Sequence, residues 1–568
     1  MSALTDQLAD LLALRIGASE PGLAIGIYRD GELVEELAAG LAVVEHAVPN
    51  TADTLFDIAS ASKQVTSACL LLLQREGRVD LGDDVRRYVP ELGLREPVTL
   101  RHCLTHTGGL REYYTLCAIS GVPLHGITED RLLRLVAGQQ DVDFAPGSAY
   151  SYSNTGYVLA AVVIRRLTGQ SVAAFAAERV FGPLGMARTH FRDDLGALVP
   201  GLATGYAPDP APAVPAPDPA ARRFRRADPI EEVVGDGGIV TSVRELAAWH
   251  AFLLTGRILG PDIRDGLLPR AVLAGGRTLD YANGLAHTSV AGLAGYGHTG
   301  AISGFRSALL CVPDAGLGVS VLANRIDLYP ALVAHRVARL ALGEPAEADR
   351  TAPVPAEVAE PARTALLGRW HDPALDVYVR LEPGADGRLE QPGAGAERSR
   401  FALAADGSWY GEGAEAGIAL RLEQDRFGQD RPDQDRLDQD RLDQDRPGGD
   451  QLLVRPAIGS DDYGTFERVP AVSDAASPPA GRYVSPELDA YATVAPGTGG
   501  GPPSVAIGIN RPWSLEPAGP DAWVADGWLT VRFADAGQTL LVSAYGAQRV
   551  RFARASASDP PPQLRGLS

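Results

Sequence analysis

The chain has 568 residues, 45% of them hydrophobic and 22% charged, so it is long enough for several domains with a core each. Its 71 acidic residues against 52 basic ones give a formal net charge of −19 at pH 7. This excess disfavours nucleic acid and anionic membrane as partners, because both repel a negative surface, and we expect a small-molecule or peptide substrate instead.

The first residues, MSALTDQLADLLALRIG, lack the basic start, apolar run and cleavage site of a secretory signal, and their pattern predicts an amphipathic helix. No later segment approaches about 18 uninterrupted apolar residues, so we expect no membrane-spanning helix. The four cysteines are too few and too irregularly spaced for a disulfide framework or a structural zinc site. The sequence therefore predicts a soluble protein of the reducing cytoplasm, with buried free thiols, no metal and no other cofactor.

Periodic patterns then define a first domain over residues 1–343. Residues 22–40 alternate around an Arg-Asp-Gly turn, which predicts a β-hairpin. Apolar residues recur at helical spacing from Ser60 to Gly77, so a helix is expected to begin at or beside Ser60. Mixed with strand-like runs such as 307–322, further helical patterns indicate an α+β domain, and they cover 129–138, 154–178, 242–256 and 327–342.

Two proline-rich stretches differ from these patterns. Residues 205–229 predict an extended, exposed loop; its arginine cluster at 222–226 could bind an anion, but a solvated loop is the simpler interpretation. Residues 344–363 have the composition of an interdomain linker.

An internal repeat follows the linker. Residues 368–378, GRWHDPALDVY, and 481–491, GRYVSPELDAY, share the frame G-R-aromatic-x-x-P-x-L-D-x-Y. Seven matches at identical spacing indicate two copies of one module, and both copies continue with strand-like alternation. We therefore expect two small antiparallel, lipocalin-like β-barrels, over residues 364–472 and 473–568.

The first module also contains a low-complexity insertion at 424–448, with five copies of Gln-Asp-Arg at a five-residue period. This period fits neither a helix nor a strand, and its charges neutralise one another. We interpret it as a surface insertion and assign it no role.

Chemistry-bearing residues gather in three short segments, of which Ser60-Ala-Ser-Lys63 is the first. A helix that starts at Ser60 places residues three apart on one face, so Lys63 Nζ can reach Ser60 Oγ. Lys63 is the only lysine in the chain. Burial can lower the pKa of a lysine until it sheds its proton near neutral pH, whereas a guanidinium stays charged. We prefer an activated serine to a chance surface lysine.

The second and third segments are Tyr152-Ser-Asn154 and His298-Thr-Gly300. A phenol with a lowered pKa can act as general base and then general acid, and an asparagine can bind a substrate amide. Each segment is weak alone, since both patterns occur by chance and a histidine in a turn or core is common.

Together and in this order, the three segments resemble the Ser-x-x-Lys, Tyr-x-Asn and Lys/His-x-Gly motifs of the serine β-lactamase and penicillin-binding-protein superfamily. The resemblance extends over about residues 5–342 and includes LTHTGGLREYY and ERVFGPLGM. The chain has a histidine in the third motif and two expected barrels after it, the second of which begins with GRYVSPELDAY. This arrangement is similar to that of the bacterial D-stereospecific aminopeptidases. That family releases N-terminal D-residues, commonly D-Ala, from peptides or amides.

The resemblance implies a role for each motif residue. Ser60 would be the acylated nucleophile, Lys63 and Tyr152 the proton-transfer pair, and Asn154 a ligand of the substrate amide. His298 would orient Tyr152 and shape the amine side of the site, and Gly300 would belong with it to the substrate-binding and oxyanion residues of the facing strand. The backbone N–H groups of Ser60 and Ala301 would form the oxyanion hole.

The same resemblance implies a homodimer and a loop of the last barrel that enters the active site. Glu516, Asp521 and Asp526 are candidates on such a loop for holding a substrate ammonium group, although surface acids are the simpler interpretation.

Alternatives stay open. A broad-specificity esterase, a β-lactamase or a D,D-peptidase-like hydrolase would share the fold. His298 replaces the lysine that usually helps hold a substrate carboxylate there, although Arg306 lies near enough in sequence to substitute. The intact Ser, Lys and Tyr set disfavours a non-catalytic β-lactam sensor. Metal-assisted hydrolysis is disfavoured because His102 and His106 lack ligand partners and are expected beside a helix cap.

Overall fold

The structure is a computed structural model of the chain. It describes residues 16–209, 223–344, 356–373, 376–384, 387–392, 398–404, 407–412, 418–423, 451–456, 464–469, 477–497, 501–519, 521–526, 529–544 and 546–556. The helix expected at the N-terminus and the Gln-Asp-Arg insertion at 424–448 lie outside the described residues.

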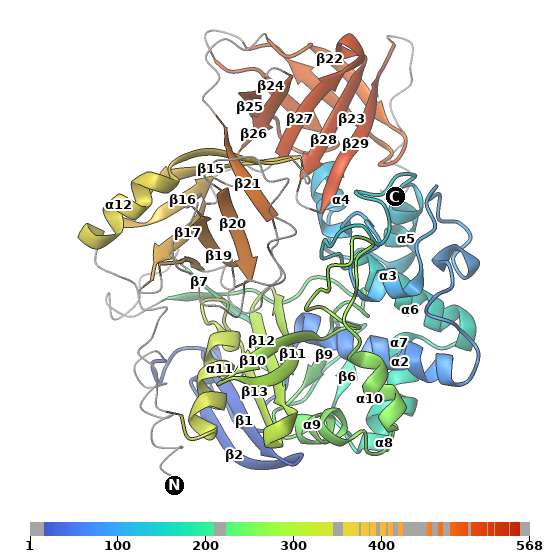
Figure 1. The fold of residues 1–568 in the computed structure, drawn as a ribbon, viewed down its shortest axis with the longest axis vertical. Helices are drawn as coiled ribbons and strands as arrows, with labels where there is room; N and C mark the ends of the chain where they lie inside the picture. The colour runs from blue at the N-terminus through green and yellow to red at the C-terminus, as the bar shows by residue number, and fades with distance from the viewer. Residues whose placement is uncertain are drawn as a thin grey trace.

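A six-stranded antiparallel sheet is the centre of the first domain, with strand order β10-β11-β12-β13-β1-β2 (Figure 1). The predicted hairpin at 22–40 is the β1–β2 pair, and the run at 307–322 lies within β12 and β13. Both central strands are buried along their whole length and are mostly apolar, because both of their faces are covered. The six strands are β1 (Leu23–Arg29), β2 (Glu32–Ala39), β10 (Ala286–Val290), β11 (Leu293–Ile302), β12 (Phe305–Val312) and β13 (Leu317–Ala323).

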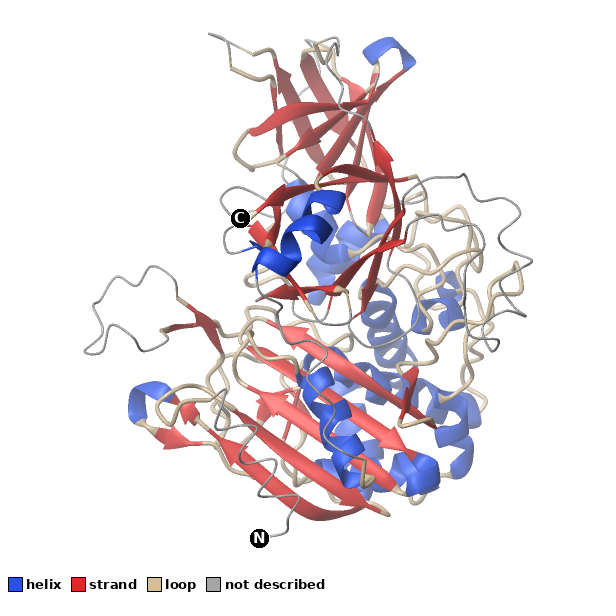
Figure 2. Ribbon diagram, turned by 60° about the vertical axis from the view of Figure 1, so that its left-hand side comes forward, coloured by secondary structure: helices blue, strands red, loops and turns tan. Residues whose placement is uncertain are grey.

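Helices cover both faces of this sheet (Figure 2). Alternate residues of β12 divide between the two sides, since Leu310 packs with α11 whereas Leu309 packs with the larger group of helices that includes α2 and α6. The helices of this domain are α2 (Lys63–Arg75), α3 (Leu100–Leu104), α4 (Tyr113–Ser120), α5 (Glu129–Ala137), α6 (Thr155–Thr168), α7 (Val172–Ala176), α8 (Gly182–Leu184), α9 (Leu246–Thr255), α10 (Pro261–Leu267) and α11 (Pro330–Ala341). All five predicted patterns contain helices, but the pattern at 154–178 is divided into α6 and α7 at Gly169, which has a left-handed backbone.

Short strands complete the domain around the sheet. They are β3 (Leu41–Val43) with β4 (Val48–Pro49), the set β5 (Phe56–Asp57), β9 (Ile239–Thr241) and β6 (His190–Phe191), and the pair β7 (Tyr206–Pro208) and β8 (Phe224–Arg226). The β7–β8 pair lies in the range expected to be an extended loop. Within its arginine cluster, Arg226 forms an ion pair with Asp228 at 2.7 Å.

Two closed eight-stranded antiparallel barrels follow. Barrel 1 comprises β14 (Gly368–Asp372), β15 (Val377–Pro383), β16 (Leu389–Pro392), β17 (Arg398–Leu403), β18 (Trp409–Glu412), β19 (Ile418–Glu423), β20 (Gln451–Pro456) and β21 (Gly464–Val469). Barrel 2 comprises β22 (Gly481–Ser485), β23 (Ala490–Ala495), β24 (Ser504–Ile507), β25 (Trp513–Gly519), β26 (Ala522–Ala525), β27 (Leu529–Ala534), β28 (Thr539–Ala544) and β29 (Ala547–Arg554).

The repeated sequence frame has the same place in both barrels. Its aromatic residues, Trp370 and Tyr483, are fully buried on the first strand of each barrel. Its aspartates, Asp376 and Asp489, both have a left-handed backbone, with φ of 50° and 48°. The repeat in the sequence therefore reflects two copies of one structural module.

The turn that follows the first strand of each barrel makes an interdomain contact. In barrel 1 this turn carries Asp376, which accepts a hydrogen bond from Arg532 of barrel 2 at 2.8 Å. In barrel 2 it carries Glu487, whose carboxylate pairs with Arg111 of the first domain at 2.6 Å. The same element of the module thus docks barrel 1 on barrel 2 and barrel 2 on the first domain.

Helix α12 (Ala356–Leu366) occupies part of the range expected to be a linker. Its residues Ala359 and Leu366 belong to the buried core of barrel 1, which explains why a proline-containing segment is helical here. The domain limits at 343, 363 and 472 stay a prediction.

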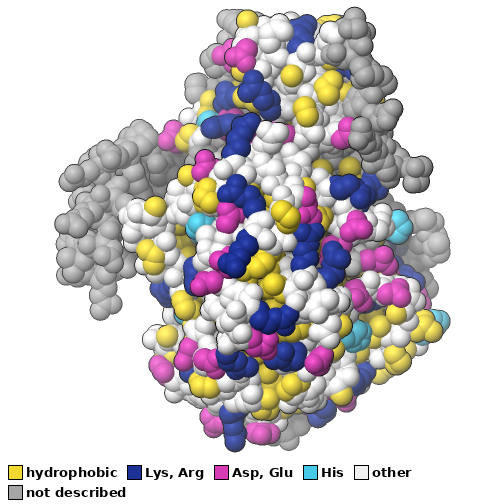
Figure 3. Space-filling view, turned by 90° about the vertical axis from the view of Figure 1, so that its right-hand side faces the viewer, with side chains coloured by type: hydrophobic (Ala, Val, Ile, Leu, Met, Phe, Trp, Pro, Cys, Tyr) yellow, Lys and Arg dark blue, Asp and Glu magenta, His cyan; other side chains and the backbone are white. Residues whose placement is uncertain are grey.

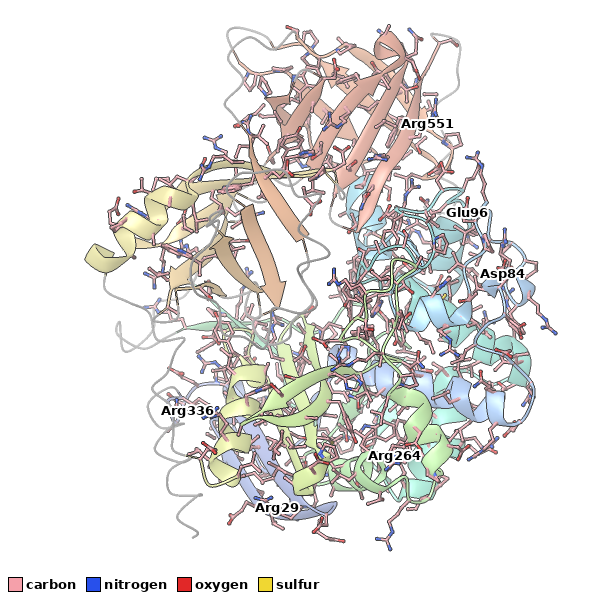
Figure 4. All side chains as sticks on the ribbon, in the orientation of Figure 1. Arg29, Asp84, Glu96, Arg264, Arg336 and Arg551 are labelled. Carbon is pink, nitrogen blue, oxygen red and sulfur yellow. The ribbon has the colours of Figure 1, made fainter. Side chains whose placement is uncertain are left out.

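Most charged side chains lie on the surface of the protein. Basic and acidic residues are interspersed over the face in Figure 3, and Asp84, Arg29 and Arg551 lie at the periphery in Figure 4. The four cysteines are buried and free, as expected. Among the described helices, none is by itself both long and apolar enough to cross a membrane; α6 and the segment Val172–Leu184 reach that level only jointly, across a 76° bend.

Candidate active site

Ser60 lies in a strained turn. The short 3-10 segment Ala59–Ser62 leads directly into α2, as the sequence predicted. Ala59 has a φ of +49°, a left-handed conformation that costs a non-glycine residue about 1–3 kcal/mol. Its N–H donates to Asp57 Oδ1 at 2.7 Å, which holds the turn in this form. Ser60 is partly exposed while the other members of the turn are buried, so the turn presents its hydroxyl group.

Lys63 is completely buried one helical turn after Ser60. Its Nζ donates to Ser60 Oγ at 3.1 Å, to Asn154 Oδ1 at 2.7 Å and to the carbonyl oxygen of Asp236 at 2.6 Å. These three acceptors aim the lysine at the serine hydroxyl.

The same surroundings set the charge of Lys63. Burial lowers the pKa of Lys63 to about 8, while the carboxylates of Asp236 and Glu112 act in the opposite direction. Both the ammonium and the amine form are therefore accessible near neutral pH, which an arginine could not provide. This explains a lone lysine in a chain that otherwise uses arginine.

Tyr152 lies between Lys63 and two histidines. Lys63 Nζ is 5.0 Å from the centre of the Tyr152 ring, and the ring of His106 packs on it at 4.1 Å between centroids. The Ser153 N–H donates to His106 Nδ1 at 3.1 Å, so His106 also fixes the backbone between Tyr152 and Asn154. His106 is buried, and burial together with the charge of Lys63 holds its pKa well below its ordinary value.

His298 is engaged by Tyr281 and by its own strand. Its Nδ1 lies 2.5 Å from the carbonyl oxygen of Thr299, and its Nε2 lies 2.8 Å from the Tyr281 hydroxyl group. Burial lowers the pKa of His298 to about 3, so the ring is neutral. The rings of His298 and Tyr281 both lie beside that of Tyr152, at 6.4 Å and 6.2 Å between centroids. The role of His298 in orienting Tyr152 stays a prediction.

Gly300 allows β11 to run directly beside the Ser60 turn. A Cβ atom on Gly300 would lie 2.0 Å from the Ile58 carbonyl oxygen and 2.4 Å from Ser307 Oγ, so only glycine fits. The next residue, Ala301, is exposed. Strand β11 thus runs alongside the Ser60 turn; the oxyanion role of the Ser60 and Ala301 N–H groups stays a prediction.

Asn154 is held by the buried Glu112. The carboxylate of Glu112 accepts hydrogen bonds from the Asn154 backbone N–H and, at 3.2 Å, from its Nδ2. Because Nδ2 donates to Glu112, Oδ1 is left to accept from Lys63. Burial raises the pKa of Glu112 to about 7.

The acids proposed for a substrate ammonium group are not drawn together. Glu516 is paired with Arg380 of barrel 1 at 2.7 Å and is thus committed to the contact between the barrels. Asp521 and Asp526 lie in turns of barrel 2, at the two ends of β26. Arg306 donates to the carbonyl oxygens of Ile302 and Phe305, where it braces the turn between β11 and β12.

Comparison with known proteins agrees with this geometry. A family model described as beta-lactamase matches residues 6–343. The chain belongs to the beta-lactamase family. The α+β catalytic fold expected from the three motifs is therefore confirmed.

Relatives within this family are similar to the chain over different lengths. A D-aminopeptidase of Gluconobacter oxydans is 30% identical over 368 residues, which are 65% of this chain and 66% of that protein. A D-aminopeptidase of Cereibacter sphaeroides is 28% identical over 512 residues, or 89% of this chain and 87% of that protein. The octameric penicillin-binding protein homologue from Pyrococcus abyssi has a TM-score of 0.53 at 20% identity, covering 82% of this chain and 99% of that one. The resemblance to D-aminopeptidases of this superfamily is confirmed.

Three contributors to this beta-lactamase-family site were not singled out from the sequence as functional. His102 and His106 were expected beside a helix cap, and both lie there: His102 forms a capping box with Thr99, and His106 directly follows the C-cap residue of α3. The contact of His106 with Tyr152 was not expected. Glu112 and His106 both belong to the stretch LTHTGGLREYY. Its resemblance to the family was the sequence signal that could have marked the two residues as functional. Tyr281 had no recognisable motif. No group of three or more His, Cys, Asp or Glu side chains is placed to hold a metal in the part of the chain that the structure describes.

Proposed function

We propose that the chain is a serine hydrolase that releases N-terminal D-residues, with D-Ala-like side chains, from peptides, amides or esters through an acyl-enzyme on Ser60. The observation that carries the proposal is the buried Lys63, with its Nζ 3.1 Å from Ser60 Oγ and its pKa lowered to about 8. The D-aminopeptidase relatives support the stereospecificity.

The residues support an acyl-transfer sequence. Neutral Lys63 takes the proton of Ser60 as Oγ forms a bond with the substrate carbonyl carbon. The backbone N–H groups of Ser60 and Ala301 stabilise the resulting oxyanion, where each such donor is typically worth a factor of about 10² to 10³. The C–N bond then breaks, and the amine leaves with a proton passed through Tyr152. Water, deprotonated by the same groups, hydrolyses the ester on Ser60.

Charge in the site favours a substrate with a free amino end. The third motif carries a neutral His298 where a lysine would supply a fixed positive charge for a substrate carboxylate. The buried acids Glu112 and Asp236 lie near Lys63 and make the surroundings more negative. An N-terminal ammonium group is attracted to such a site, whereas a terminal carboxylate is repelled.

Initial rates on D-Ala-p-nitroanilide, its L-enantiomer and nitrocefin test the proposal, with Ser60→Ala and Lys63→Arg as controls. A D-selective rate that both variants lose is the expected result. Ser60-dependent cleavage of short acyl esters or nitrocefin without D-amide turnover would instead show the alternative, a broad-specificity esterase, β-lactamase or D,D-peptidase-like hydrolase.

Two further features belong to this proposal. We infer a homodimer that acts in the cytoplasm on small peptides or amides; a solution mass of two chains by light scattering supports the dimer, and a larger assembly overturns it. The relative from Pyrococcus abyssi is octameric. The lipocalin-like character of the barrels stays a prediction.

A further inference from the structure

Helix α4 belongs to the first domain by sequence, but its apolar face is buried in barrel 2. Leu116 and Ile119 are both 0% exposed and lie in one hydrophobic cluster with barrel residues such as Tyr483 and Val505. Figure 1 shows α4 against the end of this barrel. An eight-residue helix has little stability of its own, so the barrel holds α4 in place.

Three glycines bring the barrel backbone against α4 and α5. A Cβ atom on Gly508 would lie 1.9 Å from the Ser120 carbonyl oxygen. One on Gly546 would lie 2.7 Å from Glu112 Cβ, and one on Gly138 would lie 2.7 Å from the Glu487 carbonyl oxygen. Because backbone meets backbone or Cβ at these points, no flexible side chain can absorb a shift of the barrel.

A buried ionic group fixes the same contact. The Arg111 side chain is 2% exposed and pairs with Glu487 of barrel 2 at 2.6 Å and with Asp143 at 3.4 Å. The backbone N–H of Gln548 in barrel 2 donates to Asp143 Oδ1 at 2.8 Å. A shift of the barrel that separated these partners would leave a buried charge uncompensated.

A continuous series of direct contacts leads from this interface to the nucleophile. The Glu112 N–H donates to the Gly546 carbonyl oxygen at 2.5 Å. The Glu112 carboxylate caps α4 by accepting from the Tyr114 N–H at 3.3 Å, and it also accepts from Asn154. Asn154 Oδ1 in turn accepts from Lys63, which donates to Ser60.

We propose that barrel 2 is a positioning element of the active site: through Gly546 and α4 it places Glu112, which places Asn154 and therefore Lys63. The proposal rests on the proposed function for the role of Lys63. It differs from a barrel that merely narrows access, because a positioning barrel affects the turnover of every substrate, whatever its size.

The substitution Gly546→Ala tests this. Gly546 has a φ of +78°, and the added methyl group meets Glu112. Gly537→Ala is the matched control, because Gly537 has a φ of +82° in the same barrel and its nearest neighbours are Pro479 and Arg554. We would measure kcat and KM on p-nitrophenyl acetate, D-Ala-p-nitroanilide and a D-Ala tripeptide.

We expect Gly546→Ala to lower kcat at least tenfold on every substrate cleaved, with KM within about twofold, and Gly537→Ala to leave kcat within about twofold. A normal kcat, or a change confined to the tripeptide, overturns the proposal. If the wild-type protein cleaves p-nitrophenyl acetate but not D-Ala-p-nitroanilide, the proposed function fails. The kcat values of Gly546→Ala and Gly537→Ala on the ester then still show whether barrel 2 positions the active site.

Hydrogen exchange gives an answer that does not need activity. The Asn154 N–H is bonded to Glu112, so its exchange should be at least tenfold faster in Gly546→Ala than in Gly537→Ala. Equal exchange overturns the proposal. Should Gly546→Ala not fold, Asn510→Ala replaces it, because this substitution removes only the hydrogen bonds from Nδ2 to the carbonyl oxygens of Ala118 and Ile119. We then expect a smaller decrease in kcat and a smaller increase in the exchange of the Asn154 N–H.

Discussion

The Tyr281 hydroxyl group donates a hydrogen bond to Nε2 of His298 at 2.8 Å, and this pair defines the tautomer of the motif histidine. Nδ1 faces the Thr299 carbonyl oxygen, which can only accept, so Nδ1 carries the hydrogen. The ring is neutral because burial lowers its pKa to about 3, and Nε2 is therefore an acceptor. The hydrogen bonding of His298 thus depends on Tyr281, a residue that belongs to none of the three sequence motifs.

Tyr281→Phe is expected to lower kcat about tenfold, because Nε2 of His298 would be left buried without a donor, at a cost of about 1–3 kcal/mol. Tyr296→Phe is the matched control, because Tyr296 lies on β11 close to His298. The substitution removes another buried hydroxyl group, which donates to the Leu253 carbonyl oxygen. Equal kcat in the two variants would contradict the role given to Tyr281.

The rate kcat/KM is expected to rise with pH through about 8. Below that value Lys63 is an ammonium group that cannot accept the Ser60 proton, and above it the amine is available. The charged groups facing Lys63 are Glu112 and Asp236, with His106 and His298 neutral. A rate that falls through this range would show that Lys63 must stay charged.

Glu112→Gln should move this rise to lower pH. The carboxylate of Glu112 raises the pKa of Lys63, so removing its charge lowers that pKa and frees the amine earlier. The profile of Arg165→Gln, which alters an ion pair on the surface with Glu129, should stay that of the wild type. A shift of the Glu112→Gln profile to higher pH would contradict the electrostatic assignment.

The sequence was informative where one residue type is required by local chemistry. Lys63 could be recognised because it is the only lysine, and the barrel repeat because buried Trp370 and Tyr483 share one frame. Contacts between distant segments leave no such pattern. Glu112 meets Asn154 across 42 positions, and its link to Gly546 depends on how a barrel docks, which no local spacing encodes. The pairing of Glu516 with Arg380 could not be predicted for the same reason, since Arg380 lies in the other barrel.

Gly300→Ala is expected to destabilise the protein by about 2 kcal/mol or more and to lower activity, because its methyl group would overlap the Ile58 carbonyl oxygen beside the Ser60 turn. Gly275→Ala is the control, since a Cβ atom there meets nothing within 4 Å. Thermal unfolding of both variants measures the difference. Equal unfolding temperatures would show that β11 can move away from the Ser60 turn.

Lys63→Arg should abolish turnover, by a factor of about 10³ or more, although the positive charge is kept. A guanidinium group cannot give up its proton, and it is too large for a completely buried site bounded by Ser60, Asn154 and Asp236. Lys63→Met separates the two causes, because it removes the amine and keeps a linear apolar side chain. If the loss reflects the missing base, both variants fold and both lose acylation of Ser60, followed as the burst of p-nitrophenol from p-nitrophenyl acetate. A burst of normal amplitude and rate in Lys63→Met would show that another group takes the serine proton, and the lone lysine would then need a different explanation.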